Sequence, residues 1–337
     1  EATPLHTIEP GIFGQFLERP FGDEKGPEGV ADAQGDLPEK AIAALQAMTI
    51  PVVRFPAGTD LDFTDWTHLI DRAPGRSNVM RGETHGMDPA KMATAHFGWH
   101  EYARVSERLG WQTIAVVNLL DGMAKRKPLP EAALHAAGML AYLNAPAGAK
   151  LPAGMPDWPA IRAANGRVEP IAVRYFQLGN EWRMAVFADP VRKALGTPSR
   201  EELAAWYIEV LHAYIAAIRA VDPAVELIID AEMVKGDKIE DLVLKDPLIR
   251  KEVRWATMHF NDPGPTSTNL KRQGTTIKAD QVTPDEFWQA CSAMPGHFDQ
   301  TGQNWGFLQR VTLAKSLGYR VAVTEWNDGG GGTASVS

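Results

Sequence analysis

Apolar positions along the chain form short runs that alternate with longer segments of helical spacing. The short runs have the length and the β-branched or aromatic content of buried strands. We predict strands over residues 11–18, 51–58, 112–121, 171–179, 225–230, 254–260 and 320–325. We predict helices over residues 37–48, 97–110, 130–144, 199–223, 283–294 and 304–318, with Ser199 as an N-cap. This alternation predicts a parallel sheet covered by helices.

Two α/β architectures fit such a pattern, an open doubly wound sheet and a closed (β/α)8 barrel. A dinucleotide-binding open sheet needs a glycine-rich turn after its first strand, but "GIFGQF" places its glycines within the strand. Polar residues instead follow most strands, and a barrel gathers such strand ends at one mouth. These residues, which favour the (β/α)8 TIM barrel, are Glu18, Arg54, Asn118, Glu181, Asp230, His259 and Glu325.

The count of predicted strands stops at seven. After Glu325 only "WNDGGGGTASVS" remains, and its last five residues have the length of a short eighth strand without a following helix. We therefore expect a single catalytic barrel domain over residues 1–337, with a cropped C-terminus and a missing or replaced last βα unit. Long loops at 19–36, 60–95, 145–170 and 261–282 are expected to carry function.

Composition narrows the classes of partner. The net charge is −8 and no basic block occurs, which argues against nucleic acid and anionic membrane surfaces. The sequence contains no run of about 18 apolar residues, so no transmembrane helix is predicted. The one cysteine, Cys291, excludes disulfides and multi-cysteine metal sites. The first residue is Glu1, which indicates that a leader was removed or that the sequence was cropped. The compartment therefore stays open, and the protein could be cytoplasmic, secreted or periplasmic. Homo-oligomers also remain possible.

Two apolar runs end in the same unusual dipeptide. "RYFQLGNEW" ends at Glu181 and Trp182, and "RVAVTEWN" contains Glu325 and Trp326. A barrel places its fourth and seventh strands on opposite sides of one cavity, so the two carboxylates are predicted to face each other. Paired carboxylates that flank a sugar bond are the machinery of glycoside hydrolysis, with separations of about 5–5.5 Å for retention and about 6.5–9.5 Å for inversion.

Further side chains near these strand ends suit a sugar site. The Asn180 amide can both donate to and accept from a sugar hydroxyl, and Asn118 is also predicted to bind substrate. Trp182 and Trp326 offer flat apolar faces for a sugar ring. Arg54 is a cation that would keep one glutamate ionised. Asp60, in "DLDFTD", is predicted to contact substrate, because the segment lacks the glycine and terminal glutamate of a calcium loop.

Neither a metal nor another cofactor is predicted. His96 and His100 share one face of a predicted helix, but no third ligand accompanies them in the sequence.

Four segments resemble known glycoside hydrolases. "QLGNEW" resembles the acid/base motif at strand 4 of clan A, and "VTEWN" resembles its strand 7 nucleophile motif. "GIFGQFLER" and "VVRFPAGTDLDFTDW" resemble the first two strands of glycoside hydrolase family 51, the α-L-arabinofuranosidases. The resemblance extends over most of residues 11–327. It implies a (β/α)8 barrel and a retaining double displacement. It implies Glu181 as acid/base, Glu325 as nucleophile, and contacts to the sugar or the nucleophile from Glu18, Arg54, Asn180 and His259.

Three departures from that family bear on the identity of the sugar more than on the reaction class. Ala57, Gly58, Thr59 and Asp60 stand where the family usually has two glycines and an asparagine. Phe260 follows the strand 6 histidine in place of a tyrosine, and the family's C-terminal β-sandwich has no counterpart. The predicted substrate is an oligo- or polysaccharide, and a linkage of the xylan, galactan or agar type fits as well. A non-catalytic carbohydrate-binding barrel and a metal-dependent lyase or isomerase are also compatible with the sequence.

Overall fold

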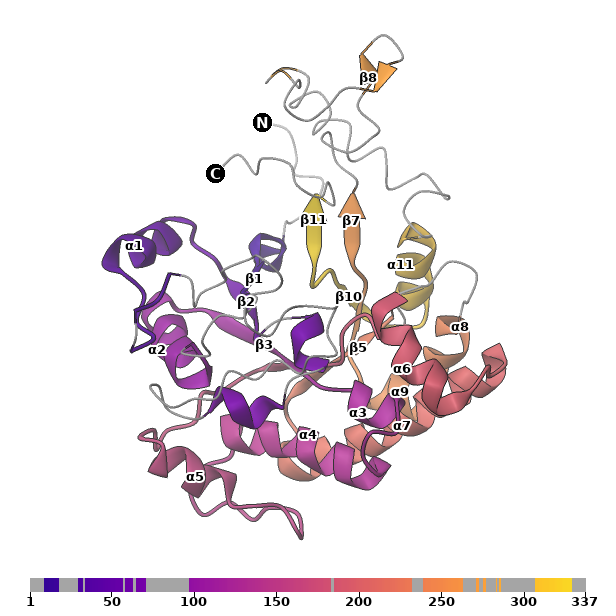
Figure 1. The fold of residues 1–337 in the computed structure, drawn as a ribbon, viewed down its shortest axis with the longest axis horizontal. Helices are drawn as coiled ribbons and strands as arrows, with labels where there is room; N and C mark the ends of the chain where they lie inside the picture. The colour runs from indigo at the N-terminus through magenta and orange to yellow at the C-terminus, as the bar shows by residue number, and fades with distance from the viewer. Residues whose placement is uncertain are drawn as a thin grey trace.

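The computed structural model contains one main sheet of seven parallel strands (Figure 1). It describes residues 9–17, 30–32, 34–56, 58–62, 65–70, 97–182, 185–231, 239–262, 271–272, 275–276, 283, 285 and 307–328. The strands of the main sheet are β1 (Gln15–Phe16), β2 (Val52–Phe55), β3 (Gln112–Val117), β4 (Tyr175–Leu178), β5 (Glu226–Asp230), β6 (Trp255–Thr257) and β10 (Arg320–Ala322).

The strands pair in the same order as they occur in the chain, from β1 through β6 to β10. Consecutive parallel strands joined by helices are the arrangement of a (β/α)8 barrel, so the predicted fold class is confirmed. Among the described residues, β1 and β10 each pair with a single neighbour, and the sheet is therefore a partial barrel. All seven carboxyl ends lie along the same edge, which places the polar strand ends near one another.

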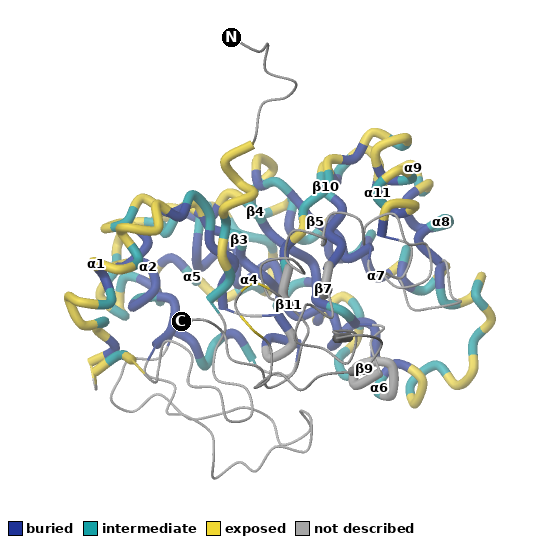
Figure 2. Tube along the Cα trace, turned by 90° about the horizontal axis from the view of Figure 1, so that it is seen from above, coloured by how far each residue is buried: buried dark blue, intermediate teal, exposed yellow. Residues whose placement is uncertain are grey.

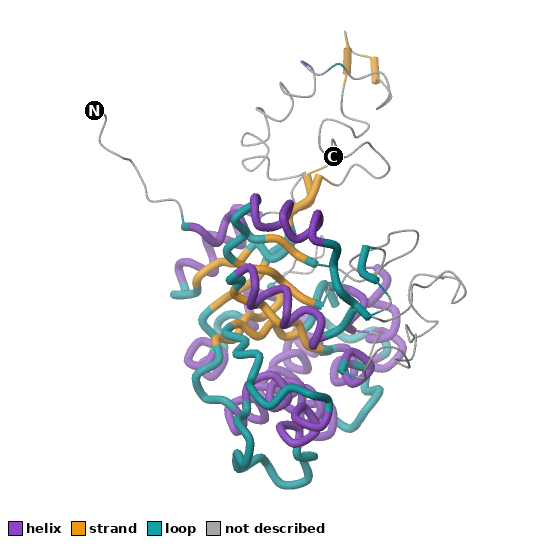
Figure 3. Tube along the Cα trace, turned by 90° about the vertical axis from the view of Figure 1, so that its left-hand side faces the viewer, coloured by secondary structure: helices purple, strands orange, loops and turns teal. Residues whose placement is uncertain are grey.

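Helices lie above and below the sheet in the view of Figure 3. They are α1 (Glu39–Ala47), α2 (Trp99–Leu109), α3 (Leu120–Met123), α4 (Leu129–Asn144), α5 (Trp158–Ala164), α6 (Ala185–Leu195), α7 (Arg200–Val221), α8 (Glu240–Val243), α9 (Pro247–Glu252) and α11 (Phe307–Ser316). Short 3-10 helices are η1 (Pro10–Phe13), η3 (Thr59–Asp62) and η4 (Trp66–Leu69). The small pairs are β7 (Phe260–Asp262) with β11 (Trp326–Asp328), and β8 (Lys271–Arg272) with β9 (Thr275–Thr276).

Helix α7 illustrates how the sequence encodes this packing. Ser199 caps it, because its hydroxyl accepts from the Glu202 N–H and the Glu202 carboxylate accepts from the Ser199 N–H. It is the one described helix long and apolar enough to cross a membrane. However, residues at helical spacing, such as Tyr207, Leu211 and Tyr214, are buried, and α7 packs against α4. These contacts are those of a core helix.

The core runs through the sheet and the inner faces of α4 and α7, as the dark blue segments in Figure 2 show. Phe55 of β2, Phe176 and Leu178 of β4, and Ile229 of β5 are fully buried. Burying such a side chain stabilises the fold by about 1.5–3 kcal/mol, so this layer holds the strand ends in fixed positions.

Several element boundaries differ from the sequence prediction. Residues 10–13 form η1, because Pro10 begins a 3-10 turn, and only Gln15–Phe16 remain as strand. The predicted strand over 254–260 divides into β6 and β7, with Met258 and His259 between them. Helix α5 lies within the predicted loop 145–170. The predicted helix over 283–294 lies outside the described residues except for Thr283 and Asp285.

Candidate active site

The turn after β4 separates two neighbouring side chains. Gly179 and Glu181 have φ values of +76° and +47°, in the left-handed region. A Cβ on Gly179 would lie 2.6 Å from the Leu119 Cβ, so the chains approach closely there. A non-glycine residue in this conformation costs roughly 1–2 kcal/mol, and such strain is concentrated at functional sites. The turn lets Glu181 reach His259, which follows β6, while Trp182 enters the core.

Arg54, at the end of β2, links three strand ends. Arg54 is only 1% exposed. Its guanidinium donates to the Asn180 Oδ1 at 2.6 Å, to the Thr324 carbonyl at 2.8 Å and to the Glu325 Oε2 at 3.3 Å. A buried guanidinium needs such partners, because an unpaired charge in the core is costly. The ends of β2, β4 and β10 are therefore held together.

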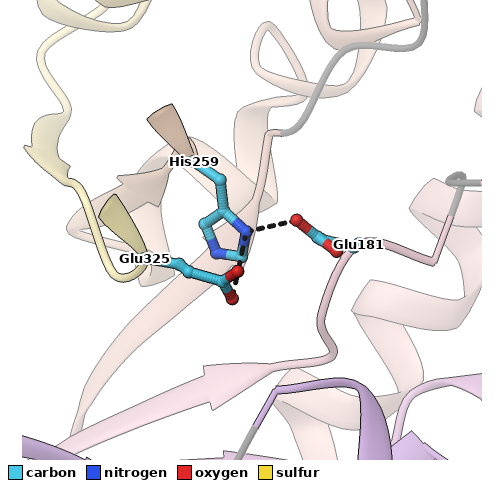
Figure 4. Close-up of side chains that lie close together, drawn as sticks. All are labelled: Glu181, His259 and Glu325. Carbon is cyan, nitrogen blue, oxygen red and sulfur yellow. Dashed lines mark hydrogen bonds and ion pairs between the residues drawn. The ribbon is translucent and has the colours of Figure 1, made fainter. Parts of the chain in front are cut away.

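His259 lies between the two glutamates, as Figure 4 shows. Its Nδ1 is 2.7 Å from the Glu181 Oε1 and 3.6 Å from the Glu325 Oε2. Its Nε2 is 3.1 Å from the Thr324 Oγ1, which in turn lies 2.5 Å from the Thr257 Oγ1. Contacts on both nitrogens fix the orientation of the ring, and the imidazole can exchange a proton with Glu181.

The two carboxylates lie close together at the barrel mouth. One oxygen of Glu181, one oxygen of Glu325 and one nitrogen of His259 all lie within 4.8 Å of one another. Three such atoms are also a possible set of metal ligands. The 2.7 Å separation of His259 and Glu181 is, however, a hydrogen-bond length, so this pair bonds directly. The geometry suits proton transfer and nucleophilic attack by paired carboxylates.

Asp62, at the end of η3, supports the site, and the sequence analysis missed it. Its Oδ1 accepts from the N–H groups of Leu119 and Leu120 at 2.8 Å and 3.2 Å, and its Oδ2 accepts from the Asn180 N–H at 3.2 Å. Burial raises the pKa of Asp62 to about 7, against the opposing effect of these N–H donors and with a further contribution from Asp230. The available signal was an acid placed between two apolar residues, in the segment that follows β2.

Two of the predicted substrate contacts, Trp182 and Asn118, have side chains that contact other parts of the protein. Trp182 is 1% exposed and packs on Tyr207 with ring centroids 4.7 Å apart, so its face is covered by protein. The Asn118 amide donates to the Asp62 carbonyl at 3.0 Å and accepts from the Asp121 N–H at 2.8 Å. Asn118 thus holds the turn after β3.

Three more of the predicted contacts lie outside the described residues. They are Glu18 and the side chains of Asp60 and Trp326, whose backbone positions are in η3 and β11. The structure brings together Arg54, Asn180, Glu181, His259 and Glu325.

The sequence is similar to known proteins. The family model described as "Alpha-L-arabinofuranosidase 1 domain" matches residues 44–263. The match includes Arg54, Asn180, Glu181 and His259. "Probable alpha-L-arabinofuranosidase C" from Aspergillus fumigatus is 26% identical over 236 residues, which are 67% of this chain and 39% of that protein. The chain thus spans about two fifths of the length of the curated relatives that it matches.

Solved structures share the fold. A family 51 α-L-arabinofuranosidase from Bifidobacterium longum superimposes with a TM-score of 0.67 and 19% identity, over 96% of this chain and 57% of that one. A family 51 arabinofuranosidase from Xanthomonas axonopodis pv. citri gives a TM-score of 0.63 and 19% identity, over 95% of this chain and 57% of that one. Since the family model covers more than half of the sequence, the chain belongs to the family of the α-L-arabinofuranosidase 1 domain.

Proposed function

We propose that residues 1–337 form the catalytic barrel domain of a retaining glycoside hydrolase that removes α-L-arabinofuranosyl groups from an oligo- or polysaccharide. Family membership supports the sugar, and the names of the relatives support the reaction class. The resemblance of the Glu181 and Glu325 segments to acid/base and nucleophile motifs supports the assignment of roles.

One observation carries the proposal: Glu181 and Glu325 approach a single His259 nitrogen from two different strand ends. One carboxylate oxygen of Glu181 lies within 4.8 Å of one carboxylate oxygen of Glu325. Inverting enzymes hold their carboxyls about 6.5–9.5 Å apart to admit a water molecule, whereas retaining enzymes hold them about 5–5.5 Å apart. The short separation favours direct attack by one carboxylate over activation of a water molecule.

In the first step, a Glu325 oxygen attacks the anomeric carbon while the glycosidic C–O bond breaks. Glu181 gives its proton to the leaving oxygen, so the alcohol departs neutral and the sugar remains as an ester of Glu325. In the second step, Glu181 takes a proton from water as that water attacks the anomeric carbon. The ester bond breaks, and both glutamates return to their starting states.

The surrounding residues divide the work between the two carboxylates. Arg54 forms an ion pair with Glu325 at 3.3 Å, which provides a cationic partner for the nucleophilic anion. His259 bonds to Glu181, the group that changes protonation during the cycle. Asn180 is held by Arg54 through its Oδ1, while its Nδ2 has no hydrogen-bond partner in the described part of the chain. This donor is suited to a sugar hydroxyl.

Azide rescue tests the assignment of both glutamates. With an aryl arabinofuranoside, Glu325→Ala should lose turnover, and azide should restore it by attacking the anomeric carbon directly. The glycosyl azide from this variant should have the anomeric configuration opposite to that of the substrate. In Glu181→Ala, azide should attack the glycosyl ester of Glu325, so its product should retain the configuration.

Products with the same configuration from both variants would reject the double displacement. Full activity in Glu325→Ala would reject the role of this residue, and wild-type protein that binds sugar without turnover would indicate a binding barrel.

A further inference from the structure

Asp62 collects hydrogen bonds from three different segments of the barrel mouth. Its carboxylate accepts three backbone N–H groups, two from the turn after β3 and one from Asn180 after β4. Its carbonyl accepts from the Asn118 Nδ2 at 3.0 Å and from the Arg126 Nη1 at 3.1 Å. A single residue after β2 therefore fixes the ends of the next two strands.

The surroundings of Asp62 are unusual for an ionisable side chain. It is 1% exposed, and within the described part of the chain its carboxylate accepts from backbone N–H groups alone. Burying a carboxylate without a cation is costly, and an amide or apolar side chain could fill the same volume. However, three N–H donors converge on this position, and a carboxylate has two oxygens that can both accept from them.

The orientation of Asn180 depends on few contacts. Among the described residues, its side chain bonds to Arg54 at 2.6 Å, and its backbone N–H bonds to Asp62. Glu181 follows directly in the strained left-handed conformation. If the Asp62 bond is lost, Arg54 alone determines where the amide points, and the turn that presents Glu181 loses its hydrogen bond to η3.

We infer that Asp62 is a positioning residue for the reaction, acting through the backbone of Asn180 to place the Asn180 amide and Glu181. This inference rests on the proposed function. Asp62 acts at one remove from the substrate. Its effect is to reduce the range of orientations of two groups that must be aligned with the sugar in the transition state.

Asp62→Asn tests the inference with little change in volume. The new amide keeps one accepting oxygen for the turn after β3, but its NH₂ group faces the Asn180 N–H, and two donors repel. We expect kcat to fall roughly 10- to 100-fold with KM changed much less, since misplacement of about 1 Å can cost about 100-fold. Asp65→Asn is the matched control, because Asp65 also accepts a backbone N–H, from Thr67 at 3.0 Å, in the same segment.

A double-mutant cycle separates positioning from a general loss of structure. If Asp62 acts partly through the Asn180 amide, Asp62→Asn should lower kcat by a smaller factor in Asn180→Ala than in the wild type, because only the effect on Glu181, carried by the backbone N–H of residue 180, remains. If the Asp62 change instead loosens the fold, the two losses should multiply. Multiplied losses, or equal kcat values in Asp62→Asn and Asp65→Asn, would overturn the inference.

Amide hydrogen exchange provides a readout that needs no turnover. The exchange rate of the Asn180 N–H should rise at least about tenfold in Asp62→Asn and stay unchanged in Asp65→Asn, while the core of α4 keeps its protection in both. Unchanged Asn180 exchange in a folded Asp62→Asn variant would overturn the inference. Wild-type protein without turnover would reject the proposed function, and exchange would then decide the role of Asp62 by itself.

Discussion

The two ends of the barrel carry similar side chains in different arrangements. At the carboxyl ends of the strands, Arg54 lies beside Glu325, and His259 joins Glu325 to Glu181. At the amino ends, Glu226 begins β5 and accepts from the Arg174 Nε and Nη2 at 3.0 Å and 2.8 Å and from the Trp255 Nε1 at 2.7 Å. Both ends thus contain an arginine–glutamate pair within a set of hydrogen bonds.

The two ends differ in whether the hydrogen-bond donors around a carboxylate serve that carboxylate alone or are shared with a second one. Burial raises the pKa of Glu226, but hydrogen bonds from Trp255 and Arg174 outweigh it and keep that pKa below its ordinary value. Glu226 therefore remains a fixed anion. Glu181 and Glu325 instead share one imidazole, whose Nδ1 lies 2.7 Å from Glu181 and 3.6 Å from Glu325. Competing carboxylates, rather than an arginine–glutamate pair, distinguish the reactive end from the stabilising end.

Removing a carboxylate from each end should give opposite outcomes. Glu181→Gln should lower kcat for substrates with poor leaving groups about 100- to 10,000-fold, because the leaving oxygen loses its proton donor. Its thermal unfolding should change little. The measurement is kcat across aryl glycosides of increasing leaving-group pKa.

Glu226→Gln is the comparison variant at the amino end. It should keep kcat within about twofold and lose roughly 1 kcal/mol of unfolding free energy, because hydrogen bonds to a charged group become neutral ones. Similar kcat losses in both variants would contradict the distinction between the two ends.

The two arginines provide the next largest contrast. Arg54→Met should destabilise the fold by about 3 kcal/mol and remove most activity, because it leaves Glu325 and Asn180 without their shared buried donor. Arg174 is largely exposed, and Arg174→Met should leave activity unchanged. Urea unfolding together with kcat/KM measures both effects. An Arg54→Met variant with normal activity would show that the links between strand ends are dispensable.

A single methyl group should perturb only the reactive end. A Cβ on Gly58 would lie 2.4 Å from the Arg54 Nη2 and 2.8 Å from the Asn180 Nδ2, so Gly58→Ala must displace one of them. We expect kcat/KM to fall about tenfold. Within the described part of the chain, Gly11 has no neighbour within 4 Å of such a Cβ, and Gly11→Ala should have no effect. Equal kcat/KM values in the two variants would argue against a tightly fitted Arg54–Asn180 pair.

The smallest change at the reactive end is the binding of one proton by Asp62. This protonation makes the free energy of unfolding depend on pH. The pKa of Asp62 is raised from 3.8 to about 7 in the folded state, so the native protein binds an extra proton between these values. The contribution of Asp62 to unfolding free energy is therefore greatest below about pH 4 and falls as pH rises through about 7. Wild type should lose about 3 kcal/mol relative to Asp62→Asn between about pH 5 and pH 8. Parallel pH curves for the two proteins in urea unfolding would contradict this.

The sequence predicts best those elements whose pattern is local. The positions of β3, β4 and α7 follow from unbroken periodicity and from a capping serine in the chain itself. The division between β6 and β7 depends on pairing with β10 and β11, which lie far along the chain, so local pattern gives no sign of it. Helix α6 was not predicted, because it contains Pro190 and a proline normally argues against a helix interior.

The site shows the same limit. Glu181 and Glu325 were identifiable because an acid at the end of an apolar strand is a local signal. The direction of Trp182 was not, because it follows a turn with left-handed backbone at Gly179 and Glu181, where strand alternation no longer predicts which way a side chain points. Asp62 was missed because its partners Leu119 and Asn180 are 57 and 118 residues away, and only the folded chain brings their N–H groups together.

Trapping of the glycosyl–enzyme tests the central claim most directly. A fluorinated arabinofuranosyl analogue with a good leaving group slows release of the sugar more than its attachment, so the covalent ester accumulates. Peptide mass spectrometry should find one added glycosyl group on Glu325 in wild type and none in Glu325→Gln. A glycosyl group on another residue, or rapid hydrolysis with no covalent adduct under any condition, would contradict the double displacement through Glu325.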